Sequence, residues 1–154
     1  MPLMHFRNAS ALFAALALSA CGTNEILDVR PTHLRSLEVV DSDQPMIRGD
    51  QQRHFYGAIG VREQEQRLGH YYVVLWNEDS VGEPVRVVFE YQQASTASKI
   101  HRQVQEFDPS SDNGRAEFRI TGDSYLEGGR VLAWKCSLFR GQREIASRHS
   151  YLWE

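Results

Sequence analysis

Histidine is the side chain in this sequence best suited to hold a metal or to move a proton near neutral pH. Beyond residue 20 the chain carries five histidines, which are His33, His54, His70, His101 and His149. No two of them have the His-x-x-x-His spacing with which a helix binds zinc. Adjacent strands could still bring His70, His101 and His149 together. Scattered surface histidines are the expectation, so we predict no metal site and no cofactor.

The chain has two cysteines, and only one of them falls in a segment with a clear structural pattern. Cys136 shares one face of the alternating segment 130–139 with Leu132, Trp134 and Leu138. This position predicts a buried thiol that packs as a small apolar side chain. An intermolecular disulfide or a reactive nucleophile is the less favoured interpretation.

The loop from Asp108 to Gly114 is the nearest approach to a known ligand or catalytic motif. Its oxygen-bearing residues alternate as in a calcium loop, but the required glycine is displaced by one position and Arg119 stands where the last ligand should be Glu. Its Ser-Asp-Asn triplet matches an element of penicillin-recognising enzymes, yet neither Ser-x-x-Lys nor Lys-Thr-Gly accompanies it. We therefore assign no catalytic residue and predict that the chain is not an enzyme.

The elements that must position any site have the pattern of β-strands, and sustained helical periodicity is absent. Segments 85–92 and 130–139 alternate apolar with polar residues, and segment 71–76 is apolar on both faces. Further strands are expected near residues 54–62, 99–107, 115–121 and 144–153. About seven strands in roughly 100 residues predict an all-β antiparallel sandwich, immunoglobulin-like in architecture, with a small β-barrel as the second choice.

Turn residues and irregular segments suggest where the domain begins and how its strands connect. Asn113-Gly114 suits a tight hairpin, and the glycines at 128–129 and 141 suit flexible reversals. Residues 21–52 are interrupted by prolines and glycine, so we expect a tether with room for one short strand. As a flexible coil it would separate its ends by about 30 Å. The sandwich domain is expected at residues 53–154.

The first 20 residues have the composition of an export signal. Arg7 is the only charged side chain among them, and an apolar run follows from Ala11 to Ala20. That run is much shorter than the roughly 20 residues needed to span a bilayer as a helix. Residues 1–20 are therefore predicted to be a signal peptide that is removed.

The apolar run ends in Leu18-Ser19-Ala20-Cys21, which resembles the lipobox of bacterial lipoproteins. The resemblance implies that Cys21 receives a diacylglycerol and becomes the first residue of the mature protein, anchored to a membrane by lipid. The alternative is an ordinary signal peptide cut after Ala20 that leaves a plain thiol. Gly22 is not the Asp that favours inner-membrane retention in enteric bacteria, so the outer membrane is the better expectation.

Two aromatic residues of the central strand, Tyr72 and Trp76, are candidates for an exposed patch that binds a protein or glycan of the envelope. The favoured interpretation is that both belong to the core, because apolar residues usually do. The formal net charge is −3, and nothing in the composition attracts nucleic acid.

The function expected from these observations is a lipid-anchored cell-envelope protein whose β-sandwich serves as a binding or structural module. The alternative is a small envelope enzyme or metal-binding protein with a site assembled from distant residues. A component of a larger envelope complex is the third hypothesis.

Overall fold

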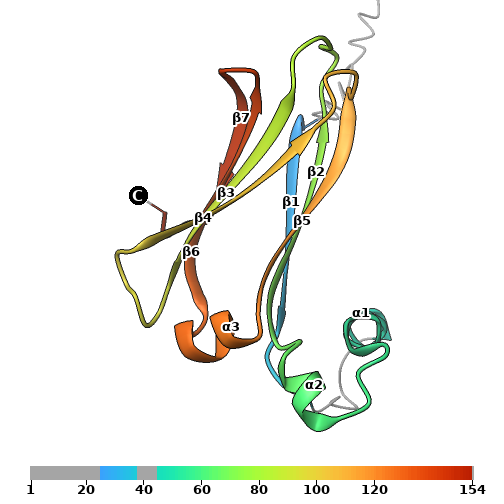
Figure 1. Ribbon diagram of the computed structural model, residues 1–154, viewed down its shortest axis with the longest axis vertical. Coiled ribbons are helices and arrows are strands. Elements are labelled where there is room, and N and C mark those ends of the chain that lie inside the picture. The colour runs from blue at the N-terminus through green and yellow to red at the C-terminus, as the bar shows by residue number, and fades with distance from the viewer. Residues whose placement is uncertain (1–24, 38–44, 154) are drawn as a thin grey trace, which may run out of the picture.

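The computed structural model describes residues 25–37 and 45–153, and within them seven strands form two antiparallel sheets packed face to face (Figure 1). One sheet has the order β1-β2-β5, made from β1 (Leu27–Leu34), β2 (Gly69–Asn77) and β5 (Asn113–Thr121). The other has the order β4-β3-β6-β7, made from β4 (Ile100–Phe107), β3 (Val85–Gln93), β6 (Val131–Arg140) and β7 (Arg143–His149). The predicted β-sandwich is confirmed, and its strands do not close into the alternative small barrel.

The strand order is close to that of an immunoglobulin constant domain, which places its first, second, fourth and fifth strands in one sheet. Here β4 pairs with β3 instead of β5, so the fourth strand has moved to the other sheet. The segment between β4 and β5 therefore crosses from one sheet to the other.

The core lies between the two sheets and is built from the alternate residues that each strand turns inward. Phe89 of β3 and Phe118 of β5 stack with their ring centres 5.1 Å apart, and both are at most 1% exposed. Tyr72 and Trp76 belong to this core, at 2% and 3% exposed. The exposed aromatic patch is therefore not formed, because both side chains contribute their area to burial between the sheets.

Cys136 is also in this core. It is fully buried, it is a free thiol, and burial raises its pKa to about 12. The prediction of a buried cysteine is confirmed. Such a thiol carries almost no thiolate near neutral pH, which makes it a poor nucleophile.

Three helices occur where the sequence pattern indicated strands or loops: α1 (Pro45–Phe55), α2 (Val61–Glu65) and α3 (Asp123–Gly128). The strand expected near residues 54–62 is wrong, because that segment holds the end of α1, a turn through Gly57 at φ 83°, and the start of α2. His54 of α1 packs on Tyr71 of β2 with ring centres 4.0 Å apart. Contact with the sheet therefore helps to hold a helix that has little amphipathic pattern of its own.

Strand β1 lies inside the segment assigned to the tether. Its eight residues pair along the whole of β2 up to Trp76, so the sandwich begins at Leu27 and not near residue 53. Pro31 is tolerated because β1 is an edge strand with β2 as its one neighbour. Only five residues separate Cys21 from Leu27, in place of the long flexible coil considered from the sequence.

Asn113 and Gly114 do not form a hairpin turn. They are the first two residues of β5, where Gly114 pairs with Trp76 of β2. A Cβ on Gly114 would lie 2.5 Å from Cζ2 of the Trp76 indole. The glycine is needed for close packing against this ring and not for a positive φ.

Side chains bridge both open sides of the sandwich. On one side, the amides of Gln103 and Gln105 in β4 donate to the carbonyls of Arg119 (3.2 Å) and Glu117 (2.7 Å) in β5. On the other side, Arg148 of β7 donates to the carbonyl of Leu27 and pairs with the carboxylate of Glu25. Within the described ranges, no helix has both the length and the apolar character that crossing a bilayer demands.

The two ends of the sandwich differ. We call the end with segments 78–84 and 108–112 and the turn at Gly141 the loop end, which is uppermost in Figure 1. The end that carries α1, α2 and α3 is the helix end, lowermost in the same view. Since Leu27 pairs with Trp76 and Leu34 with Gly69, β1 enters at the loop end and leaves at the helix end.

Candidate functional site

The three histidines considered for convergence lie apart. His101 stacks on Tyr91 at 5.1 Å, and His149 is hydrogen-bonded to the carbonyl of Ser150. They occupy β4 and β7, the opposite edges of the four-stranded sheet, which are three strand spacings or about 14 Å apart. His70 lies in the other sheet. No group of three or more His, Cys, Asp or Glu residues is placed to hold a metal ion in the part of the chain that the structure describes.

His70 instead pairs with His33, which faces it directly across the β1–β2 ladder. The two imidazoles stack with centres 3.8 Å apart and planes 14° from parallel. Both follow the alternation that turns Tyr72 inward, so the pair sits between the sheets at the helix end. The hydroxyl of Tyr125 in α3 lies 2.9 Å from Nε2 of His33 and holds that ring from the side.

Both histidines are held in their neutral form. Burial, with smaller contributions from His33, Arg130 and Arg35, lowers the pKa of His70 to about 4. The pKa of His33 is also lowered, first by burial and then by Arg35 and Arg130. The backbone N–H of Val131 donates to Nε2 of His70 at 3.2 Å, so that nitrogen carries no proton. At pH 7 the pair therefore presents two uncharged rings.

A cavity of about 540 Å³ opens beside this pair. Arg35, at the end of β1, and Arg130, just before β6, contribute two guanidinium groups to its lining, while Leu132 and Leu152 contribute apolar surface. Neither arginine forms an ion pair with an acid among the residues that the structure describes. We call this space the histidine cavity.

The charges around the histidine cavity select against a metal and for an anion. Two imidazole nitrogens could begin a metal site, but no carboxylate or thiolate lines the space to complete it. The charges of Arg35 and Arg130, which add to the effect of burial on both histidine pKa values, would also repel a cation. Guanidinium groups match the planar geometry of carboxylates and phosphates, and the leucines can cover an apolar part of the same ligand.

The loop end holds a different kind of arginine. The Arg140 side chain is 3% exposed, and its Nε and Nη2 both lie 2.8 Å from Oε2 of Glu78. It also donates to three backbone carbonyls: those of Glu83 (3.0 Å), Pro109 (3.4 Å) and Ser111 (3.0 Å). Through these contacts Arg140 holds the loops at this end of the sandwich together.

Of the residues considered for a site from the sequence, only His70 lines the histidine cavity. Cys21 lies outside the described residues, and Tyr72 and Trp76 are core. The sequence does not predict His33 as a partner because this residue falls in the segment assigned to the tether, where the apolar residues at 27 and 29 are a weak indication of a strand. Comparison of the chain with protein-family models, curated proteins and solved structures finds no match.

Proposed function

We propose that this chain is a lipid-anchored protein of the bacterial cell envelope whose β-sandwich is a binding module for an anionic ligand. The observation that carries the binding proposal is the stacked pair of neutral imidazoles that lines a cavity together with Arg35 and Arg130 and without an acidic lining residue. The anionic group would belong to an envelope protein or to an acidic glycan. Guanidinium donors would supply most of its affinity.

The anchor is proposed from the lipobox, with lipid on Cys21 and the outer membrane as the favoured site. Five intervening residues let the chain reach at most about 20 Å from Cys21 to Leu27. A lipidated Cys21 would thus keep the loop end near the membrane. The nine residues of β2 span about 30 Å, so the histidine cavity would be presented on the far side, away from the headgroups.

Binding of an anion should be coupled to proton uptake. A negative charge beside His70 favours the protonated ring and raises a pKa that is about 4 in the free protein. The affinity should therefore increase as the pH falls from 7 toward 5, because the complex then binds protons that the free protein does not. A ligand held by the arginines alone would show no such increase.

A pair of matched probes tests the binding site. Benzoate joins a carboxylate to an apolar ring, and benzylammonium has the same ring with the opposite charge. We expect benzoate to shift the amide resonances of Val131 and His70 in NMR titrations and to bind tightest at low pH. Arg35→Gln with Arg130→Gln should weaken benzoate at least tenfold.

The matched control removes two exposed arginines elsewhere, by Arg102→Gln with Arg115→Gln, and should leave benzoate binding unchanged. Equal binding of benzylammonium would contradict an anion site. So would an equal loss in the control variant, because it would show that only the net charge matters.

The anchor has its own test, which is the intact mass of the protein from the membrane fraction of cells expressing the full-length chain. We expect a mass that fits residues 21–154 plus acylglycerol, and its loss in Cys21→Ser. An unmodified mass in both proteins would contradict the anchor and would leave the binding proposal standing.

A further inference from the structure

A second cavity lies on the outer face of the three-stranded sheet, on the side opposite the histidine cavity. It encloses about 380 Å³ between the sheet and helices α1 and α2. Arginines from three separate elements line it: Arg53 from α1, Arg67 from the turn after α2, and Arg119 from β5. No Asp or Glu is among its lining residues. We call this space the arginine cavity.

The guanidinium group of Arg67 in the arginine cavity is held in place by the fold. Nη1 of Arg67 donates to the carbonyls of His54 (2.9 Å) and Tyr56 (2.7 Å), where α1 ends. The hydroxyl of Tyr71, a residue only 5% exposed, donates to the carbonyl of Arg67 at 2.6 Å. Because the Arg67 side chain is already ordered, a ligand that binds it would lose little affinity to the entropy of ordering that side chain.

Arg119 keeps donors for a ligand. Its Nε is 2.8 Å from Oε1 of Glu117, and a guanidinium group has five N–H donors in all. Its two terminal nitrogens make no hydrogen bond or ion pair with any residue that the structure describes. The same side chain can therefore pair with Glu117 and still donate into the cavity.

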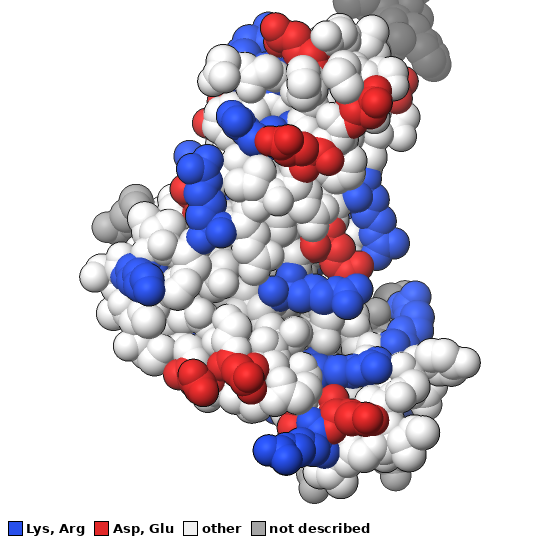
Figure 2. Space-filling model, viewed as in Figure 1, with Lys and Arg blue, Asp and Glu red and all other residues white. Residues whose placement is uncertain are grey.

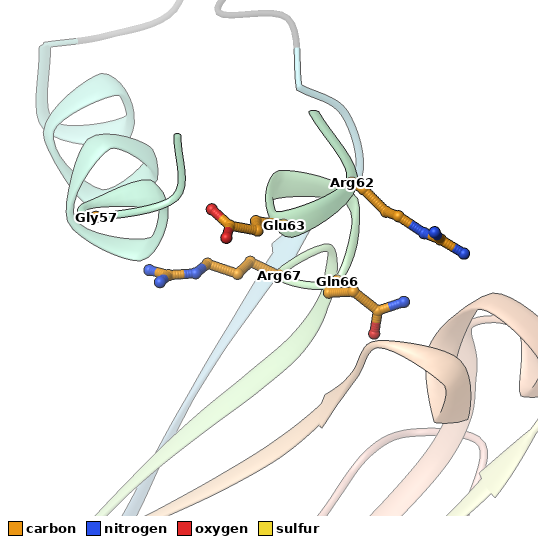
Figure 3. A pocket seen from close by; sticks show the side chains of 5 residues that line it. All are labelled: Gly57, Arg62, Glu63, Gln66 and Arg67. Carbon is orange, nitrogen blue, oxygen red and sulfur yellow. The ribbon is translucent and has the colours of Figure 1, made fainter. Parts of the chain in front are cut away.

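A neighbouring cavity provides an internal contrast. It holds about 530 Å³ and shares Gln66 and Arg67 with the arginine cavity, but Glu63 also lines it. Figure 3 shows Glu63 and Arg67 pointing to the same side, toward α1 and Gly57, while Arg62 points away. This neighbour supplies its own carboxylate, and the arginine cavity does not. Figure 2 shows blue Lys or Arg side chains where the helices meet the sheet, with red acidic side chains beside them.

We propose that the arginine cavity binds a tetrahedral oxyanion, as found in a phosphate ester or a sulfate group. Three guanidinium groups that approach from three elements suit an anion with several oxygens better than a single planar carboxylate. The lining is largely polar, unlike that of the histidine cavity, so the recognised part of the ligand is the charged group itself. The phosphate could come from a soluble molecule or from a lipid headgroup of a membrane other than the one that a lipidated Cys21 would enter, because the arginine cavity also lies at the helix end.

Calorimetric titration of the purified protein with inorganic phosphate, at constant ionic strength, tests the site. Arg53→Gln with Arg119→Gln should weaken phosphate binding more than tenfold. Arg67 is left intact because its hydrogen bonds to the carbonyls of His54 and Tyr56 also hold the end of α1 in place. The control, Arg62→Gln with Arg102→Gln, removes the same charge outside the cavity and should bind phosphate as the parent does. Unchanged thermal unfolding in both variants would show that the fold is kept.

The two cavities are distinguished by their probes. Benzoate binding at the histidine cavity should survive Arg53→Gln with Arg119→Gln, so failure of one site does not imply failure of the other. Vesicles of phosphatidylcholine with and without phosphatidylglycerol separate the sources, because binding only to the anionic vesicles would assign a headgroup. Absence of binding to both phosphate and anionic vesicles would overturn the proposal, as would an equal loss of binding in the control variant.

Discussion

Arginine has opposite roles at the two ends of this sandwich, as Arg140 at one end and Arg35 and Arg130 at the other show. At the loop end, Arg140 is buried, paired with Glu78 and bonded to three carbonyls. At the helix end, Arg35 and Arg130 border an open cavity and have no acidic partner within the described ranges. A guanidinium whose donors are all engaged stabilises structure, whereas one that faces a cavity without a counter-charge is available to a ligand.

The largest effect is expected from breaking the pair at the loop end. Arg140→Met should reduce the free energy of unfolding by about 3–5 kcal/mol, because it leaves the Glu78 carboxylate buried without its partner. Urea unfolding measures this loss. Adding Glu78→Gln should restore much of it, and Arg143→Met, at an exposed position, should cost little. A small loss in Arg140→Met would mean that the loop end is not held by this arginine.

A second effect at the loop end is steric. Gly114→Ala places a methyl group against the Trp76 indole and should cost roughly 1–3 kcal/mol in thermal or urea unfolding, because a packed ring must shift. Gly60→Ala is the control, since a Cβ there meets nothing within 4 Å. Equal stability of the two variants would show that the ring moves freely.

At the helix end the expected effect depends on pH. The pKa of His70 is about 4 in the folded protein, whereas an ordinary histidine, as in the unfolded chain, has a pKa of 6.5. Between pH 6.5 and pH 4 the unfolded chain therefore binds a proton on His70 that the folded protein does not. Stability should therefore fall as the pH falls through this window, by about 1–2 kcal/mol. His70→Gln should flatten the profile in urea unfolding at pH 7, 6, 5 and 4. A similar flattening in His149→Gln would refute this assignment.

The smallest expected effect on stability comes from removing the two arginines that line the histidine cavity. Arg35→Gln with Arg130→Gln should change the free energy of unfolding by less than about 0.5 kcal/mol, as for other surface substitutions without a buried partner. Urea unfolding beside Arg140→Met gives the comparison directly. A loss as large as that of Arg140→Met would show that Arg35 and Arg130 stabilise the fold as well.

The strands with regular alternation were predictable, because a strand that buries one face needs an apolar side chain at every second position. Segments 85–92 and 130–139 are β3 and β6, the two central strands of their sheet. Strand β1 was harder to recognise, since Pro31 argues against a strand and is tolerated only at an edge. Helix α1 was missed because its sequence lacks an amphipathic period and its contact with Tyr71 exists only in the folded chain.

The candidate sites could not be predicted, because they depend on register and on sheet assignment. His33 and His70 are 37 positions apart, and only the β1–β2 pairing brings their rings together. The Asn113-Gly114 pair has the residue types of a hairpin turn. Its local pattern does not reveal that the chain passes at this point from β4 in one sheet to β5 in the other. Local residue types predict elements, whereas a cavity lined by residues from three elements requires their arrangement.

The side chains that close the open sides of the sandwich bear on self-association. Exposed strand edges invite pairing with a second copy, and lipid anchoring would crowd copies together in two dimensions. Gln103 and Gln105 already occupy carbonyls along β5, and Arg148 occupies one on β1. These contacts shield acceptors that a neighbouring chain would need, so they disfavour edge-to-edge pairing between copies that are held close together.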